Sequence, residues 1–202
     1  MSLVSCLSHK YIVTVSGAQS GIGKTVLAEY LLPLLKNFAA IKITIEDFFT
    51  AVVCDDAAIL VPGKDTYRLK CSGAKQVVWV RTPEHNLIES MEQACSLLVD
   101  CAGVLIEGNS ILTYINPDLA FFVYGGELQP LKPSRLYALK KAHVIINNIR
   151  DSSAVTTAHE KTLRAANPTA VITTLNLSNP SSVTSFLKTV LQRHPFAKGS
   201  PP

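Results

Sequence analysis

Residues 11–25 read Tyr-Ile-Val-Thr-Val-Ser-Gly-Ala-Gln-Ser-Gly-Ile-Gly-Lys-Thr. The run 11–16 is short, apolar and rich in β-branched side chains, which predicts a buried strand. Apolar residues recur at helical spacing from residue 24 to about 36, which predicts a helix. The stretch between them fits the phosphate-loop pattern G-x-x-x-x-G-K-[ST], with alanine in the first place. The candidate nucleotide-binding residues are therefore Ala18, Gln19, Ser20, Gly21, Ile22, Gly23, Lys24 and Thr25.

Each residue type in this loop suits the binding of a nucleoside triphosphate. Glycines let successive backbone N–H groups point at one anion, and the start of the helix adds partial positive charge. Lys24 is expected to reach the β and γ phosphates, and the Thr25 hydroxyl to ligate Mg²⁺. A plain glycine-rich turn is the simpler alternative. The sequence does not fit a dinucleotide-binding turn, because the third glycine of that motif is missing. It does not fit a nucleophile elbow either, because no glycines flank the serine at the required positions.

The rest of the chain alternates apolar runs with amphipathic segments. This order predicts one α/β domain with the phosphate-loop fold, a mostly parallel sheet and helices on both faces. We expect this domain over residues 1–193, with a long functional loop over 46–63, with or without a small hairpin, and a flexible tail over 194–202. Further strands are expected at 39–45, 76–80, 103–106, 119–124, 143–146 and 170–175, and further helices at 64–72, 84–99, 134–141, 156–166 and 181–193.

Composition narrows the class of protein. Hydrophobic residues make up 48% of the 202 residues, which excludes wholesale disorder. A net charge of +4 is too small to indicate a nucleic-acid partner. Five cysteines without a C-x-x-C pair favour free thiols, and no apolar run is long enough for a membrane helix. We therefore expect a cytoplasmic protein with neither a membrane nor a nucleic-acid partner.

Charged residues at or near strand ends are further candidates for binding the metal and the nucleotide and for catalysis. Glu107 ends the run Val-Leu-Ile-Glu-Gly, where a carboxylate would hold Mg²⁺ or its waters, although a solvent-exposed acid is the alternative. Lys42 lies inside an apolar run and is expected to face the ligand, unless the strand is an edge strand. Hydrolysis needs an oriented water, for which Asp47 and Glu107 are the candidates, with Lys24 as the third catalytic residue.

A third motif concerns the base of the nucleotide. Asn148 and Asp151 follow the strand expected at 143–146 at the spacing of the N-K-x-D guanine reader, with isoleucine in the lysine place. A carboxylate there can accept from the guanine N1–H and N2–H₂, which favours GTP over ATP. Asparagine and aspartate are also ordinary loop residues after a strand, and the match is short.

Taken together, these motifs resemble the molybdopterin-guanine dinucleotide biosynthesis protein B family. The loop 18–25, the strand end Ile-Lys-x-Thr at 41–44, the Gly-Lys-Asp-Thr-Tyr-Arg segment at 63–68 and the run 104–108 carry the resemblance. It implies a dimeric, weakly GTP-hydrolysing adapter in molybdenum-cofactor maturation, with Mg²⁺ at Thr25 and Glu107. A cofactor-biosynthesis protein or a molybdopterin-type ligand would be its partner. Lys42, Lys64, Asp65 and Arg68 would line the neighbouring surface.

Two departures from that family and one competing resemblance remain. Residues 43–47 lack the family's histidines, and Asn109-Ser110 replaces the usual continuation after Gly108. The loop and the Glu107-Gly108 pair are also similar to dethiobiotin synthetase, an ATP-dependent enzyme that phosphorylates a carbamate. Under that alternative, Lys24, Lys42 and Mg²⁺ would stabilise a phosphoryl group during its transfer.

Overall fold

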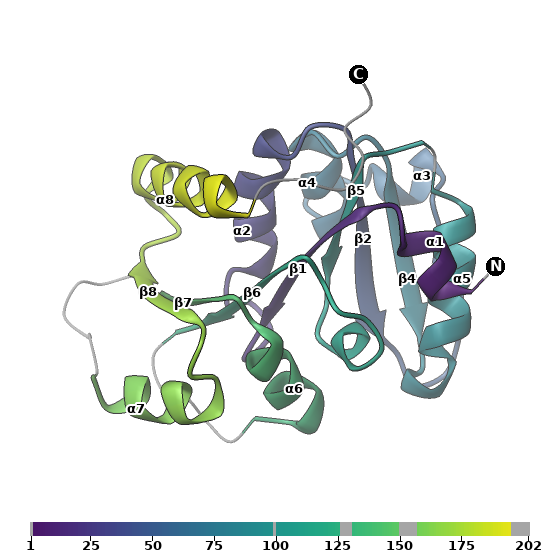
Figure 1. Cartoon of the computed structure of the whole chain (residues 1–202). Helices are drawn as coiled ribbons and strands as arrows, with labels where there is room; N and C mark the ends of the chain where they lie inside the picture. The colour runs from purple at the N-terminus through teal and green to yellow at the C-terminus, as the bar shows by residue number, and fades with distance from the viewer. Residues whose placement is uncertain (1, 99, 126–130, 150–156, 195–202) are drawn as a thin grey trace.

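A sheet with β1 at its centre organises the molecule (Figure 1). The computed structural model describes residues 2–98, 100–125, 131–149 and 157–194. Within these ranges the sheet has eight strands in the order β3-β4-β2-β5-β1-β6-β7-β8. All neighbours are parallel except β3 and β4, which are antiparallel. The strands are β1 (Tyr11–Gly17), β2 (Phe38–Ile45), β3 (Ala51–Val53), β4 (Val77–Thr82), β5 (Gly103–Glu107), β6 (Leu119–Tyr124), β7 (Val144–Asn148) and β8 (Val171–Leu175).

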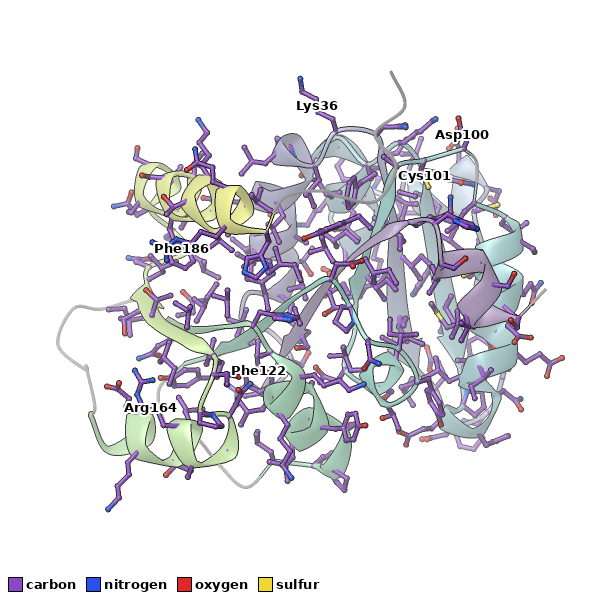
Figure 2. The ribbon with its side chains drawn as sticks, in the orientation of Figure 1. Lys36, Asp100, Cys101, Phe122, Arg164 and Phe186 are labelled. Atoms are coloured by element: carbon purple, nitrogen blue, oxygen red, sulfur yellow. The ribbon has the colours of Figure 1, made fainter. Side chains whose placement is uncertain are left out.

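Helices cover both faces of the sheet, which explains why every residue of β1 is buried. Helices α2, α4 and α8 pack on one face, and α1, α5, α6 and α7 pack on the other. Phe122 of β6 belongs to the cluster beneath α6 (Figure 2). The helices are α1 (Leu3–Leu7), α2 (Lys24–Leu31), α3 (Asp56–Ile59), α4 (Asp65–Cys71), α5 (Leu87–Ser96), α6 (Pro133–Lys141), α7 (Thr157–Ala166) and α8 (Pro180–Arg193), with 3-10 helices η1 (Leu32–Leu34), η2 (Glu84–Asn86) and η3 (Ser110–Thr113).

The predicted α/β domain with a mostly parallel sheet is confirmed, and the differences lie at element ends. The helix predicted over 24–36 ends as α2 at Leu31, because Pro33 lacks the N–H that would continue its hydrogen bonding. The helix predicted from 84 begins with η2, and α5 starts only at Leu87. Helix α1 was not predicted.

The segment 46–63, expected to be a loop, contains short regular structure. Its strand β3 pairs with β4 and forms one edge of the sheet, and α3 follows two residues after β3. Strand β2 pairs with β4 on one side and β5 on the other, so it lies in the interior of the sheet. Within the described part of the chain, no helix is long and apolar enough to cross a membrane.

Candidate functional site

The loop between β1 and α2 is shaped by two glycines in the left-handed region. Gly21 has φ of 71° and Gly23 has φ of 107°. Gly23 is also the N-cap of α2, so no side chain caps the first turn of that helix, and that turn contains no acidic residue. Such a helix start leaves backbone N–H groups available to an anion, as the loop motif requires.

Two asparagine side chains hold this loop in place. The Gly17 N–H donates to Oδ1 of Asn109 at 2.9 Å, and Nδ2 of Asn109 donates to the Gly17 carbonyl at 3.1 Å. Farther along, Nδ2 of Asn148 donates to the Ile22 carbonyl at 2.9 Å, and its Oδ1 accepts from the Leu177 N–H at 3.1 Å. The loop is therefore fixed at its start by the residues after β5 and at its end by β7.

Lys24 is a cation held beside this loop without a carboxylate partner in the residues described. Its ammonium donates to the Gln19 carbonyl at 2.9 Å. Burial is the main cause that lowers the pKa of Lys24, and the positive charges of Lys42 and Arg135 act in the same direction, against the Glu107 carboxylate. A partly desolvated lysine among other cations is an arrangement that a bound anion stabilises.

Glu107 lies at the centre of a second, charged cluster. Its side chain is only 1% exposed, so the alternative of a solvent-exposed acid is wrong. Thr25 Oγ1 donates to the carboxylate at 3.0 and 3.1 Å, and Lys42 Nζ lies 2.5 Å from Oε1. Lys42 is the register partner of Glu107, and β2 is an interior strand, which also excludes the edge-strand explanation of Lys42.

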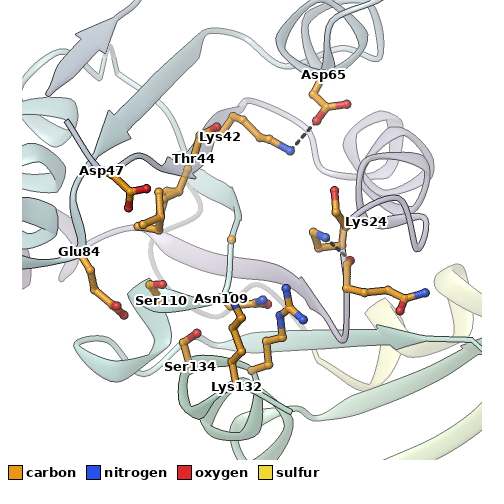
Figure 3. A pocket seen from close by; sticks show the side chains of 16 residues that line it. Lys24, Lys42, Thr44, Asp47, Asp65, Glu84, Asn109, Ser110, Lys132 and Ser134 are labelled. Atoms are coloured by element: carbon orange, nitrogen blue, oxygen red, sulfur yellow. Dashed lines mark hydrogen bonds and ion pairs between the residues drawn. The ribbon is translucent and has the colours of Figure 1, made fainter. Parts of the chain in front are cut away.

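Asp65, at the start of α4, completes this cluster. Its Oδ2 lies 2.6 Å from Lys42 Nζ (Figure 3). Burial alone would lower the pKa of Lys42, but the two carboxylates outweigh it and raise that pKa. Burial likewise acts to raise the pKa of Asp65, but the hydrogen bond from Lys42 and its positive charge outweigh burial and lower that pKa. The sequence placed Asp65 only on the neighbouring surface.

The oxygen atoms of this cluster suit a hard divalent cation. A threonine hydroxyl and the Glu107 carboxylate are in hydrogen-bond contact, with the Asp65 carboxylate joined to them through Lys42. Mg²⁺ prefers such oxygen ligands and is held in proteins by one or two carboxylates together with phosphates and waters. Thr25 and Glu107, with Asp65 beside them, therefore fit the group that the loop motif predicts.

A pocket of about 600 Å³ opens beside the loop and this cluster (Figure 3). Figure 3 shows Asp47 and Glu84 at the end away from Lys24, and Lys132 and Ser134 across from Lys42 and Asp65. The pocket brings together the loop, the carboxyl ends of β2 and β5 and the start of α6. Its lining residues are Gln19, Ser20, Lys24, Lys42, Ile43, Thr44, Ile45, Asp47, Asp65, Glu84, Gly108, Asn109, Ser110, Lys132, Ser134 and Arg135.

The remaining predicted residues have varied positions. Asp47 lines the pocket with an exposed side chain. Asp151 lies outside the described residues. Arg68 makes a two-pronged ion pair with Glu29 of α2, with distances of 2.7 and 2.8 Å. Asn109 and the cations of α6 were not predicted, because only the folded chain brings them to the loop.

Comparisons with known proteins concern the family and the fold. A model of the family "Molybdopterin guanine dinucleotide synthesis protein B" matches residues 12–112, which is half of the chain. HypB from Helicobacter pylori, solved in complex with nickel, has a TM-score of 0.56 at 16% identity, over 96% of this chain and 91% of that one. The hydrogenase maturation factor HypB from Archaeoglobus fulgidus has a TM-score of 0.54 at 18% identity, over 94% and 93%. At such identities the similarity concerns the fold. No curated protein sequence gives a significant match.

Proposed function

The chain belongs to the molybdopterin guanine dinucleotide synthesis protein B family, and on that premise we propose that it binds a nucleoside triphosphate with Mg²⁺ and hydrolyses it slowly. GTP is the preferred nucleotide, and the role is that of an adapter in molybdenum-cofactor biosynthesis. The observation that carries the proposal is the contact of Thr25 with the buried Glu107 directly beside Lys24 and its loop. This contact supports a phosphate-binding role for Lys24 and a metal-binding role for the Thr25–Glu107 pair at the same helix start.

Each group then has a distinct task in hydrolysis. Lys24 and the N–H groups of the loop neutralise the β and γ phosphates, and Thr25 and Glu107 hold the cation. Mg²⁺, when bound, supplies positive charge to the phosphate oxygens. Because Glu107 holds the cation in this proposal, we assign the orientation of the attacking water to Asp47, whose side chain is exposed in the same pocket.

Base selection is assigned to the end of β7. Asn148 holds the loop from this side, and Asp151 is proposed to accept from the guanine N–H groups that adenine lacks. The pocket beyond the loop is larger than a terminal phosphate requires, which supports a further ligand or partner at this point. We propose a molybdopterin-type ligand or a cofactor-biosynthesis protein as that partner, and a homodimer as the working state.

Calorimetric titration of the protein with GTP and with ATP, each with Mg²⁺, tests the proposal. We expect tighter binding of GTP and loss of most affinity in Lys24→Ala, because backbone donors alone would face the phosphate charge. Lys36→Ala is the matched control, since Lys36 is an exposed lysine beyond η1. Unchanged affinity in Lys24→Ala would contradict the assignment of the site.

The size of the pocket also favours a second candidate function. An ATP-dependent enzyme similar to dethiobiotin synthetase would phosphorylate a small carboxylate or carbamate held against Lys42. Release of ADP that depends on such an acceptor would identify this activity. Slow phosphate release that small acceptors leave unchanged would instead support the adapter.

A further inference from the structure

Helix α6 begins with an unusual charge arrangement. Its N-cap is Lys132, its first residue is Pro133, and Arg135 also lies in the first turn, which contains no acidic residue. The start of a helix carries partial positive charge, so two cations there disfavour the helix by a few tenths of a kcal/mol each. Local arrangements that cost stability in this way tend to occur at functional sites.

These α6 cations line the same pocket as Lys24. Neither Lys132 nor Arg135 forms an ion pair with a described residue, and the Arg135 side chain is half-buried. By contrast, Lys141 at the other end of α6 donates to the Ile115 carbonyl and to Asn116. The charge of Arg135 also acts on Lys24, which agrees with their sharing one pocket.

The cations on the two sides of the pocket differ in whether they pair with carboxylates. On the first, Lys42 is neutralised by Asp65 and Glu107. On the other, Lys132 and Arg135 pair with no carboxylate among the described residues, and Figure 3 shows Lys132 across the pocket from Lys42 and Asp65. A guanidinium is planar, always charged and suited to two-pronged phosphate binding. An anion between Lys24 and α6 would therefore be held from both sides.

We propose that Arg135 is a catalytic residue that binds the terminal phosphate of the bound triphosphate from the α6 side. This inference rests on the proposed function, and Arg135 lies outside the residues matched by the family. In the reaction, a water oxygen forms a bond to the γ phosphorus while the bond from that phosphorus to the β–γ bridging oxygen breaks. The products are the nucleoside diphosphate, inorganic phosphate and a proton released to water. Arg135 neutralises charge on the γ-phosphate oxygens during this step.

Nucleotide binding and turnover in Arg135→Ala test this assignment. We expect affinity for the β,γ-imido triphosphate analogue to fall about tenfold or more, while affinity for the diphosphate stays as in the unaltered protein. The hydrolysis rate should fall about 10³-fold or more, and the complex of diphosphate with fluoroaluminate should be lost. Arg135→Lys should restore part of the triphosphate affinity, because it keeps the charge without the planar fork.

The control is Lys140→Ala, which removes an exposed cation from the last turn of the same helix and should leave these values unchanged. Equal weakening of triphosphate and diphosphate binding in Arg135→Ala would overturn the assignment, as would an unchanged hydrolysis rate. In both cases the proposed function survives if the unaltered protein still binds nucleotide through Lys24. Absence of nucleotide binding in the unaltered protein would overturn both.

Discussion

Replacing Lys42 with methionine isolates the charge balance at the centre of the site. The ammonium of Lys42 lies 2.5 Å from Glu107 and 2.6 Å from Asp65, and the Glu107 side chain is 1% exposed. Methionine keeps most of the apolar stem but leaves the Glu107 carboxylate buried without its cation. Removing one partner of a buried pair costs about 3–5 kcal/mol, so Lys42→Met should lower the free energy of unfolding by that amount.

The two carboxylates should differ in their coupling to Lys42. Asp65 is 42% exposed, so Asp65→Asn should cost below about 1 kcal/mol. In the double variant Lys42→Met/Glu107→Gln no buried charge remains unpaired, and much of the loss should be recovered.

Equilibrium urea unfolding followed by circular dichroism, with a chelator present, measures these differences. In thermal unfolding the loss in Lys42→Met corresponds to a fall in Tm of roughly 10 °C. A loss below about 1 kcal/mol in Lys42→Met, with an unchanged denaturant slope, would refute the reasoning, because it would mean that Glu107 does not depend on Lys42. The reasoning would also be refuted if the double variant lost as much stability as the two single variants added together.

Three further predictions concern the loop and the far half of the sheet. Gly23→Ala should lower the free energy of unfolding by about 2 kcal/mol or more, because φ is 107° and the new Cβ would lie 2.9 Å from Asn148 Nδ2. Gly21→Ala, whose Cβ would meet open space, should lower it by only about 1 kcal/mol. Urea unfolding of both variants measures the difference. Asn148→Ala removes both hydrogen bonds that join the loop to Leu177 and should cost about 2 kcal/mol; calorimetry should show GTP and ATP weakened alike, and a selective loss of GTP would contradict this. Burial, with His194 adding and Asp118 opposing, lowers the pKa of His143, so the unfolded chain binds its proton more readily and stability falls as pH drops below about 6.5. Thermal unfolding at pH 5.5 and 7.5 should show this loss, reduced in His143→Asn, and an equal loss in the variant would exclude His143 as its source.

Much of the architecture could be predicted because buried parallel strands have a simple composition. The run 119–124 is apolar throughout, and β6 has those bounds. Strand β3 could not be predicted, because its three residues are only half-buried and form an edge whose pairing with β4 depends on the folded chain. Pro33 indicates that a regular helix cannot continue past it, but it does not indicate at which earlier residue the helix ends. The end of α2 at Leu31, followed by a 3-10 turn, therefore had to come from the structure.

The residues of the site likewise divide into those that the sequence could place and those that only the fold brings together. Lys24 and Thr25 belong to a local motif, and Glu107 ends a strand, so residue type and order were enough to place them together. Asp65 meets Lys42 only because α4 begins beside the end of β2, and Asn109 reaches Gly17 across two neighbouring strands. Contacts of this kind depend on strand order, which no spacing along the chain encodes.

The central place of β1 also determines when the loop can take its shape during synthesis. Strand β1 pairs with β5 from Gly103 and with β6 from Leu119, so it leaves the ribosome long before either neighbour. The bond that fixes the start of the loop joins residues 92 positions apart. A nascent chain that stops before β5 therefore carries the complete phosphate-loop sequence without the neighbouring strand and the Asn109 side chain that position it, and nucleotide cannot assist its early folding.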